Sequence, residues 1–117
     1  MTDNQSAKRS WEMVERFYRS VRGQYGGDYT GIESVIEHVR QNGLDDVLFG
    51  STSHEFLLIS SQRDCSTKDS IRIGQEGGVV RFEFFDSTIG HYETVGEAEV
   101  GQMADLVRDC LSRITCV

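Results

Sequence analysis

The chain has 117 residues, of which 38% are hydrophobic and 26% are charged. This composition is typical of one globular domain and excludes a fibrous, disordered or disulfide-dense chain. No apolar run approaches the roughly 20 residues that a membrane-spanning helix needs, and the polar N-terminus does not have the form of a signal peptide. We therefore expect a single domain over residues 1–117, with residues 1–7 frayed and no membrane partner.

Charge is unevenly distributed along the chain. Nineteen acidic and twelve basic side chains give a net charge of −7, with a balance of +2 in residues 1–22 and −9 in the remainder. An acidic body repels phosphate, so we do not expect a nucleic-acid partner. The same field attracts a basic protein. Solubility is the other common reason for a net charge of this size.

Two helices are predicted in the first third of the chain, because apolar residues recur there at spacings of three and four. The first spans residues 8–22 and is followed by Gly23, a residue that suits a helix end. The second begins at Thr30, which forms a capping-box pattern with Glu33, and ends at Gly43. The stripe residues are Trp11, Val14, Phe17, Tyr18 and Val21 in the first helix and Ile32, Val35, Ile36 and Val39 in the second.

The middle of the chain changes to the shorter period that is typical of strands. We predict strands over residues 47–49, 54–60, 70–73, 80–85 and 91–95, the last of them at an edge. Residues 50–53, 75–78 and 86–90 have the composition of turns. Such short connections between strands predict an antiparallel meander.

A third helix is predicted near the C-terminus, with Glu97 and Glu99 at its start, where acidic residues suit the positive end of a helix. The fold class is therefore α+β: two N-terminal helices, an antiparallel sheet of four or five strands, and a C-terminal helix packed on the sheet. The apolar stripe of this last helix comprises Val100, Met103, Ala104, Val107, Cys110, Leu111 and Ile114.

The two faces of the predicted sheet differ in character. Ile71, Ile73 and Phe82 belong to a face that is apolar throughout, whereas the opposite face mixes apolar and charged residues. Either a helix covers this second face, or Phe85 and one of Leu57 and Leu58 form an exposed patch. Such a patch would mark a partner site or a homodimer through the sheet.

No motif for catalysis, cofactor binding or metal binding is present. The three histidines lack ligand spacing, and the three cysteines contain no CxxC pair, so we expect neither a metal nor a disulfide framework. The glycine-rich segment 23–31 lacks the preceding strand and the lysine of a phosphate loop. We expect a reduced, cytoplasmic protein without a cofactor that is not an enzyme.

Two stretches of acidic residues are the candidate partner-binding site. They contain Asp45, Asp46 and Glu55, and then Glu93, Glu97 and Glu99, to which Phe85 adds an apolar group. If these residues share one surface, they would attract a basic protein; otherwise they are a solvated surface. Small bacterial immunity and inhibitor proteins share this physical profile, so the leading hypothesis is a non-enzymatic protein-binding module.

Two alternatives remain open. A small-molecule-binding protein or small enzyme would have its site between the helices and the sheet. The candidates for that site are Tyr25, Tyr29, His54, His91 and Tyr92. A nucleic-acid mimic would need a continuous acidic stripe, and arginines interrupt the acidic residues along the chain.

Overall fold

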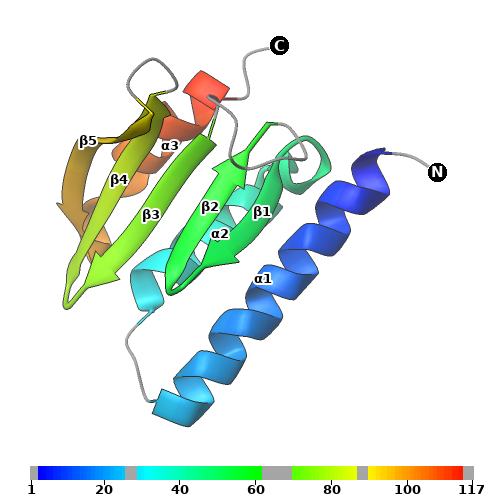
Figure 1. The fold of residues 1–117 in the computed structure, drawn as a ribbon, viewed down its shortest axis with the longest axis horizontal. Coiled ribbons are helices and arrows are strands. Elements are labelled where there is room, and N and C mark those ends of the chain that lie inside the picture. Colours follow the sequence, from blue (N-terminus) through cyan, green and yellow to red (C-terminus); the bar gives the residue numbers. More distant parts are fainter. Residues whose placement is uncertain (1–2, 26–28, 62–69, 87–89, 115–117) are drawn as a thin grey trace.

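The computed structural model describes residues 3–25, 29–61, 70–86 and 90–114 and contains three helices and one sheet within them (Figure 1). The helices are α1 (Asp3–Tyr25), α2 (Thr30–Gln41) and α3 (Ala104–Ile114). The strands are β1 (Phe49–Ser53), β2 (Phe56–Ser60), β3 (Ser70–Glu76), β4 (Val79–Asp86) and β5 (His91–Glu99). Each strand pairs antiparallel with the next, which confirms the predicted α+β meander.

All three helices pack on the same face of the sheet. Trp11 of α1 lies over Gly50 of β1, and the Leu106 side chain of α3 lies over Gly96 of β5. Gly50 pairs with Ile59, a buried residue of the core face. The core therefore lies between this face and the helix layer, with α1 alongside β1 and with α2 and α3 behind the sheet (Figure 1).

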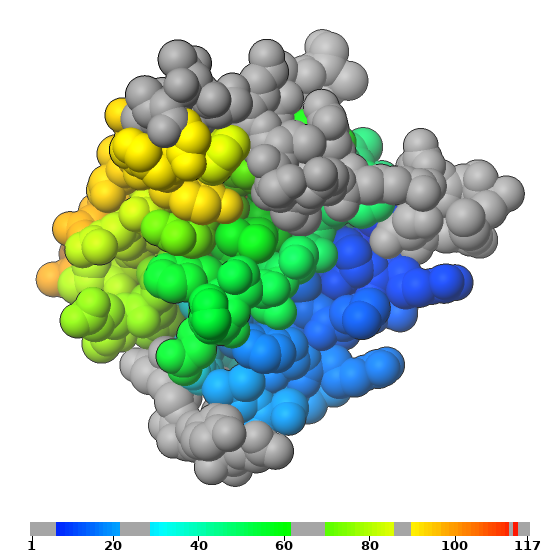
Figure 2. Space-filling view, viewed as in Figure 1, coloured from blue at the N-terminus to red at the C-terminus, as the bar shows by residue number. Residues whose placement is uncertain are grey.

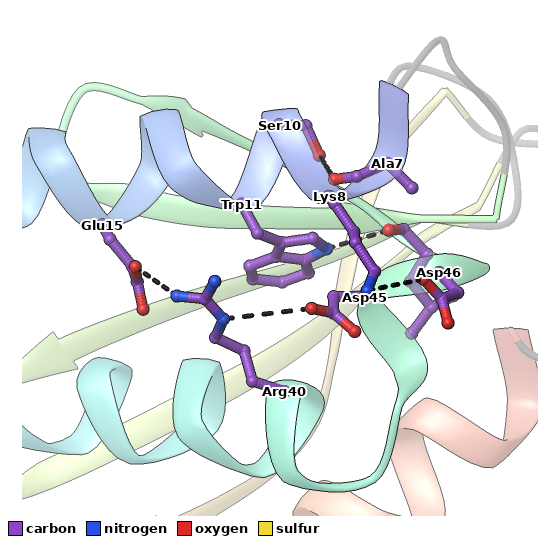
Figure 3. Close-up of polar contacts among 9 residues, drawn as sticks. Ala7, Lys8, Ser10, Trp11, Glu15, Arg40, Asp45 and Asp46 are labelled. Carbon is purple, nitrogen blue, oxygen red and sulfur yellow. Dashed lines mark hydrogen bonds and ion pairs between the residues drawn. The ribbon is translucent and has the colours of Figure 1, made fainter. Parts of the chain in front are cut away.

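Helix α1 closes the β1 edge of the sheet. Trp11 is fully buried, and its Nε1 donates a hydrogen bond to the carbonyl oxygen of Leu48 at 2.8 Å (Figure 3). The Ser10 hydroxyl accepts a hydrogen bond from the Gly50 backbone N–H at 3.0 Å. The helix starts earlier than expected, at Asp3, and Ala7 is already buried. It also continues past Gly23 to Tyr25.

The N-terminus of α2 is capped by a side chain from the sheet. The Gln75 Oε1 of β3 accepts hydrogen bonds from the backbone N–H groups of Gly31 at 2.8 Å and Ile32 at 3.4 Å. The N-cap residue is Tyr29, so Thr30 does not occupy the position that the predicted capping box required. At the other end, Gly43 has the expected left-handed backbone with φ of 70°.

Strand boundaries differ from the prediction at both ends of the sheet. β1 occupies residues 49–53, whereas the sequence predicts a strand over 47–49 and a turn over 50–53; the polar residues of β1 are tolerated because it is an edge strand. The turn falls instead at His54, whose φ is 56°. β5 continues to Glu99, because its pairing with β4 resumes after a bulge opposite Phe82 and Glu83. Glu97 and Glu99 therefore lie on a strand, not at the start of a helix.

Substitution of Gly31 by alanine tests the close approach of α2 to the sheet. A Cβ there would overlap Val80 Cγ2 and lie 2.9 Å from Gln75 Oε1. We expect Gly31→Ala to lower the free energy of unfolding by about 1–3 kcal/mol, the usual cost of overpacking. Urea denaturation measures this. Gly101→Ala is the control, because no atom lies within 4 Å of that Cβ position, and an equal effect of both changes would contradict the packing argument.

Candidate functional site

The sheet face opposite the helices, called the open face here, is covered by none of the helices that the structure describes. Figure 2 looks onto it, with the side chains of β1 to β4 at the surface between α1 and β5. The strand register places on it Ser51, Ser53, Phe56, Leu58, Arg72, Glu76, Val79, Arg81, Glu83, Phe85, Tyr92, Thr94, Glu97 and Glu99. The open face is thus a mixture of aromatic and charged groups.

Arg72 connects four strands of the open face. Its guanidinium carbon lies 4.7 Å from the ring centroid of Phe56 on β2 and 4.1 Å from that of Tyr92 on β5. Its Nε also donates a hydrogen bond to Glu83 Oε1 on β4 at 2.8 Å. Stacking between two rings and a charge-assisted hydrogen bond both hold a guanidinium in one orientation.

The absence of a side chain at Gly74 allows Phe56 to lie flat on the open face. A Cβ at Gly74 would lie 2.7 Å from Phe56 Cε1 and 2.9 Å from its Cδ1. The ring can therefore approach the β3 backbone closely while it contacts Arg72. Glycine in a strand often marks such a close approach.

A second ion pair and a shallow pocket lie beside Arg72. Arg81 Nε donates a hydrogen bond to Glu97 Oε2 at 2.6 Å, which joins β4 to β5. The pocket has a volume of about 230 Å³, and Phe56, Gly74 and Val79 line it together with the two arginines and with Gln75, Glu76, Glu83 and Glu97. The pocket thus combines an apolar floor with charges of both signs, and two of its carboxylates, Glu83 and Glu97, are paired with its two arginines.

Three of the predicted site residues, Phe85, Glu97 and Glu99, lie on the open face. A fourth, Glu93 of β5, pairs with Phe84 and therefore faces the helix side of the sheet. Phe85 is half-buried and packs edge-to-face on Tyr92, with 5.3 Å between the ring centroids. Glu97 is paired with Arg81, whereas Glu93 and Glu99 are exposed on β5 and form no ion pair with any other described side chain. The prediction left open which of Leu57 and Leu58 shares this face with Phe85; Leu57 is buried in the core, and Leu58 lies on the open face.

The other three predicted acidic residues lie toward the opposite edge of the sheet. Asp45 is buried, and its Oδ2 is 3.9 Å from Arg40 Nε (Figure 3). Asp46 Oδ1 is 3.4 Å from Lys8 Nζ. These two carboxylates connect the short helix Leu44–Asp46 to α2 and α1. β1 and β5 are the two edges of the sheet, so the two predicted acidic stretches do not form one surface.

Glu55 is part of a tyrosine cluster at the turn between β1 and β2. Its carboxylate accepts a hydrogen bond from the Tyr29 hydroxyl, and its carbonyl oxygen accepts one from Tyr18 at 3.0 Å. The hydrogen bond to Glu55, assisted by burial, raises the pKa of Tyr29 to about 12. Burial likewise raises the pKa of Tyr18. The cluster fixes the turn to both N-terminal helices.

The candidates for a small-molecule site do not converge. Tyr29 is buried in that cluster, His54 is exposed at the turn, and His91 and Tyr92 lie on β5. The side chain of Tyr25 lies outside the described part of the structure. A separate groove of about 370 Å³ runs between α1 and α2, lined by Glu15, Tyr18, Arg19, Glu33, Ile36, Glu37, Arg40 and Gln41.

Metal ligands and thiols add no further site within the described ranges. No group of three or more His, Cys, Asp or Glu residues there is arranged to hold a metal ion. Cys110 is a buried core residue, as expected, and Cys65 and Cys116 lie outside the described residues.

None of the described helices has the length and hydrophobicity that crossing a bilayer requires. On the open face, Arg72 and Arg81 lie among the carboxylates that a nucleic-acid mimic would need to align.

Comparison with known proteins returned no match to a family model, to a curated protein or to a solved structure.

Sequence reasoning did not identify Arg72, Tyr92 and Glu83 as members of one cluster. The alternation of Arg72 with Ile71 and Ile73 does place the arginine on the second face of the sheet. The register between β2, β3 and β5 decides which rings meet it, and no local pattern in the sequence specifies that register.

Replacing Arg72 with lysine tests the stacked cluster. Lysine keeps the charge and loses the planar group that lies between the two rings. We expect the free energy of unfolding to fall by about 1–2 kcal/mol, as measured by urea denaturation. The exposed Arg108, which pairs with Asp105 within α3, provides the matched control: Arg108→Lys should change stability by less than about 0.5 kcal/mol. An equal loss of stability in Arg72→Lys and Arg108→Lys would show that stacking of Arg72 on the two rings does not stabilise the fold.

The tyrosine cluster predicts a loss of stability at alkaline pH. An unfolded tyrosine ionises near pH 10, whereas folded Tyr29 retains its proton up to about pH 12. The unfolded chain then binds fewer protons than the folded one, so the free energy of unfolding should fall as pH rises from 10 to 12.

Tyr29→Phe provides the comparison for this pH dependence. The variant should be less stable than the wild type at pH 8 and should show a smaller decline above pH 10. A remaining decline is expected because the pKa of Tyr18 is also raised. Urea denaturation at a series of pH values measures both, and parallel curves for the two proteins would contradict the assignment.

Proposed function

We propose that this protein is a non-enzymatic binding module that recognises a basic protein through the open face and strand β5, in the manner of an inhibitor or immunity protein. The observation that carries the proposal is a sheet face with none of the described helices over it, on which aromatic groups are held in place beside exposed carboxylates.

Preorganisation of the open face supports a role in binding. Phe56 and Tyr92 are fixed by their contacts with Arg72, and Phe85 is fixed by Tyr92. A partner that docks there would therefore lose little side-chain freedom from these residues. Aromatic and arginine side chains are also those that most often dominate binding energy at protein interfaces.

The charge at the margin of this surface favours a basic partner. Glu99 is exposed at the end of β5 and Glu76 at the end of β3, and both pair with Val79 on the open face. Together with a net charge of −7 for the chain, these carboxylates would accelerate the association of a cationic protein. Ion pairs at an exposed margin act mainly on the association rate, so binding should weaken as salt is raised.

Small-molecule binding is the second candidate function, and the groove between α1 and α2 is the observation that favours it. Its volume of about 370 Å³ falls within the range of ligand pockets. Charged side chains of both signs line it, including Glu37 and Arg19. A ligand there would be polar and would contact the helix layer, far from the open face.

Charge reversal at the margin of the open face tests the proposed function. The variant Glu76→Lys with Glu99→Lys and the wild type, both tagged, would be used to capture partners from a lysate of the protein's own cells. We expect the wild type to retain one dominant basic protein that is released at high salt. The double variant should retain at least about tenfold less of it, because two attractive charges become repulsive.

The matched control is Glu12→Lys with Glu37→Lys, which makes the same change in net charge on the exposed surfaces of α1 and α2. This variant should capture as much partner as the wild type. Equal loss in both variants would indicate only non-specific charge attraction. Loss in the control alone would move the binding site to the helix layer, and capture of no partner at all would contradict the proposed function.

A further inference from the structure

The two edge strands of the sheet differ in whether another element lies along their outer side. At β1, helix α1 lies along the edge, and Ser10 accepts the hydrogen bond of the Gly50 N–H. At β5, no described strand pairs with the outer side of residues 91–99, and α3 contacts the core face through Leu106 over Gly96. An unpaired edge presents backbone donors and acceptors that a further strand can use.

We infer that the outer edge of β5 binds an extended basic segment of a partner protein as an added strand, opposite Gly96–Glu99. This inference rests on the proposed function and specifies how the partner is held. Backbone hydrogen bonds to β5 would supply attachment, and side chains on the added strand would supply selectivity.

The side chains of this part of β5 indicate the chemistry of the added strand. Glu97 and Glu99 are two residues apart and project onto the open face, as their pairing with Arg81 and Val79 shows. Residues directly opposite each other on adjacent antiparallel strands have Cβ atoms about 5 Å apart. Lysine or arginine at every second position of the added strand would therefore lie against Glu99 and against Glu97, which would then be shared with Arg81.

A second copy of this chain is a poor occupant of the same edge. Antiparallel pairing of two β5 strands centred on Glu97 would place that glutamate opposite itself, and centring on Ala98 would place Glu97 opposite Glu99. Like charges directly opposite each other destabilise a strand pair. In these two registers the glutamates oppose self-association, whereas a strand of opposite charge meets no such repulsion.

The bulge in β5 limits the length of the site. Pairing with β4 shifts between Thr94 and Gly96, so the regular edge facing the open-face glutamates comprises residues 96–99. A strand of this length forms only a few backbone hydrogen bonds, each of modest net value. We therefore expect the added strand to bind weakly on its own and to need the open face for full affinity.

A synthetic peptide tests the inference directly. The probe is a fluorescent peptide of four lysines alternating with four valines, titrated with the full-length protein at low ionic strength and followed by fluorescence anisotropy. The control peptide has the same sequence with every backbone nitrogen methylated. It retains the charge and cannot donate backbone hydrogen bonds, so it should bind at least about tenfold more weakly.

Two protein variants complete the experiment. Glu97→Gln with Glu99→Gln should weaken binding of the parent peptide by about tenfold, whereas Glu12→Gln with Glu37→Gln should leave it unchanged. Amide hydrogen exchange should show added protection within residues 96–99 when the parent peptide is present.

Three results would overturn the strand-addition inference: no binding of the parent peptide, equal binding of the methylated peptide, or an unchanged affinity in the Glu97 and Glu99 variant. If partner capture still depended on Glu76 and Glu99, the proposed function would stand and only the mode of attachment would fail. If capture also failed, both would be rejected.

Discussion

The packing of Trp11 against Gly50 places α1 on the same face of the sheet as α2 and α3. A side chain at residue 50 would meet the indole ring at about 3.0 Å, so the contact depends on glycine. The indole N–H is bonded to Leu48, which leaves no buried donor unsatisfied at this point. Helix α1 thereby lies along the outer edge of β1. Because all three described helices pack on one face, none of them covers the open face.

The composition of the open face follows from that arrangement. This face carries several charged side chains, yet β2 and β4 bring Phe56 and Phe85 to it. Arg72 resolves this conflict because a guanidinium can stack on rings while it also pairs with Glu83. The same contacts order the aromatic groups, which is why the face is suited to binding as well as to solvation.

The carboxylates of the chain have divided roles. Asp45 and Asp46 hold the junction between the N-terminal helices, and Glu55 anchors a turn through Tyr29. These residues are engaged in stabilising the fold. On β5, by contrast, Glu93 and Glu99 are exposed and form no ion pair with another described side chain. Their negative charge can therefore interact with a partner. Acidic composition alone could not distinguish the two groups.

Hydrophobic spacing in the sequence determined the three helices, the meander order and most of the core, because periods of 3.6 and 2 residues are local properties. Strand positions that depend on long-range pairing were decided by the tertiary structure: β1 formed from turn-like residues, and β5 extended to Glu99. The cap on α2 came from Gln75, 44 residues away from Gly31. The cluster around Arg72 likewise required the register of four strands, which no local pattern specifies.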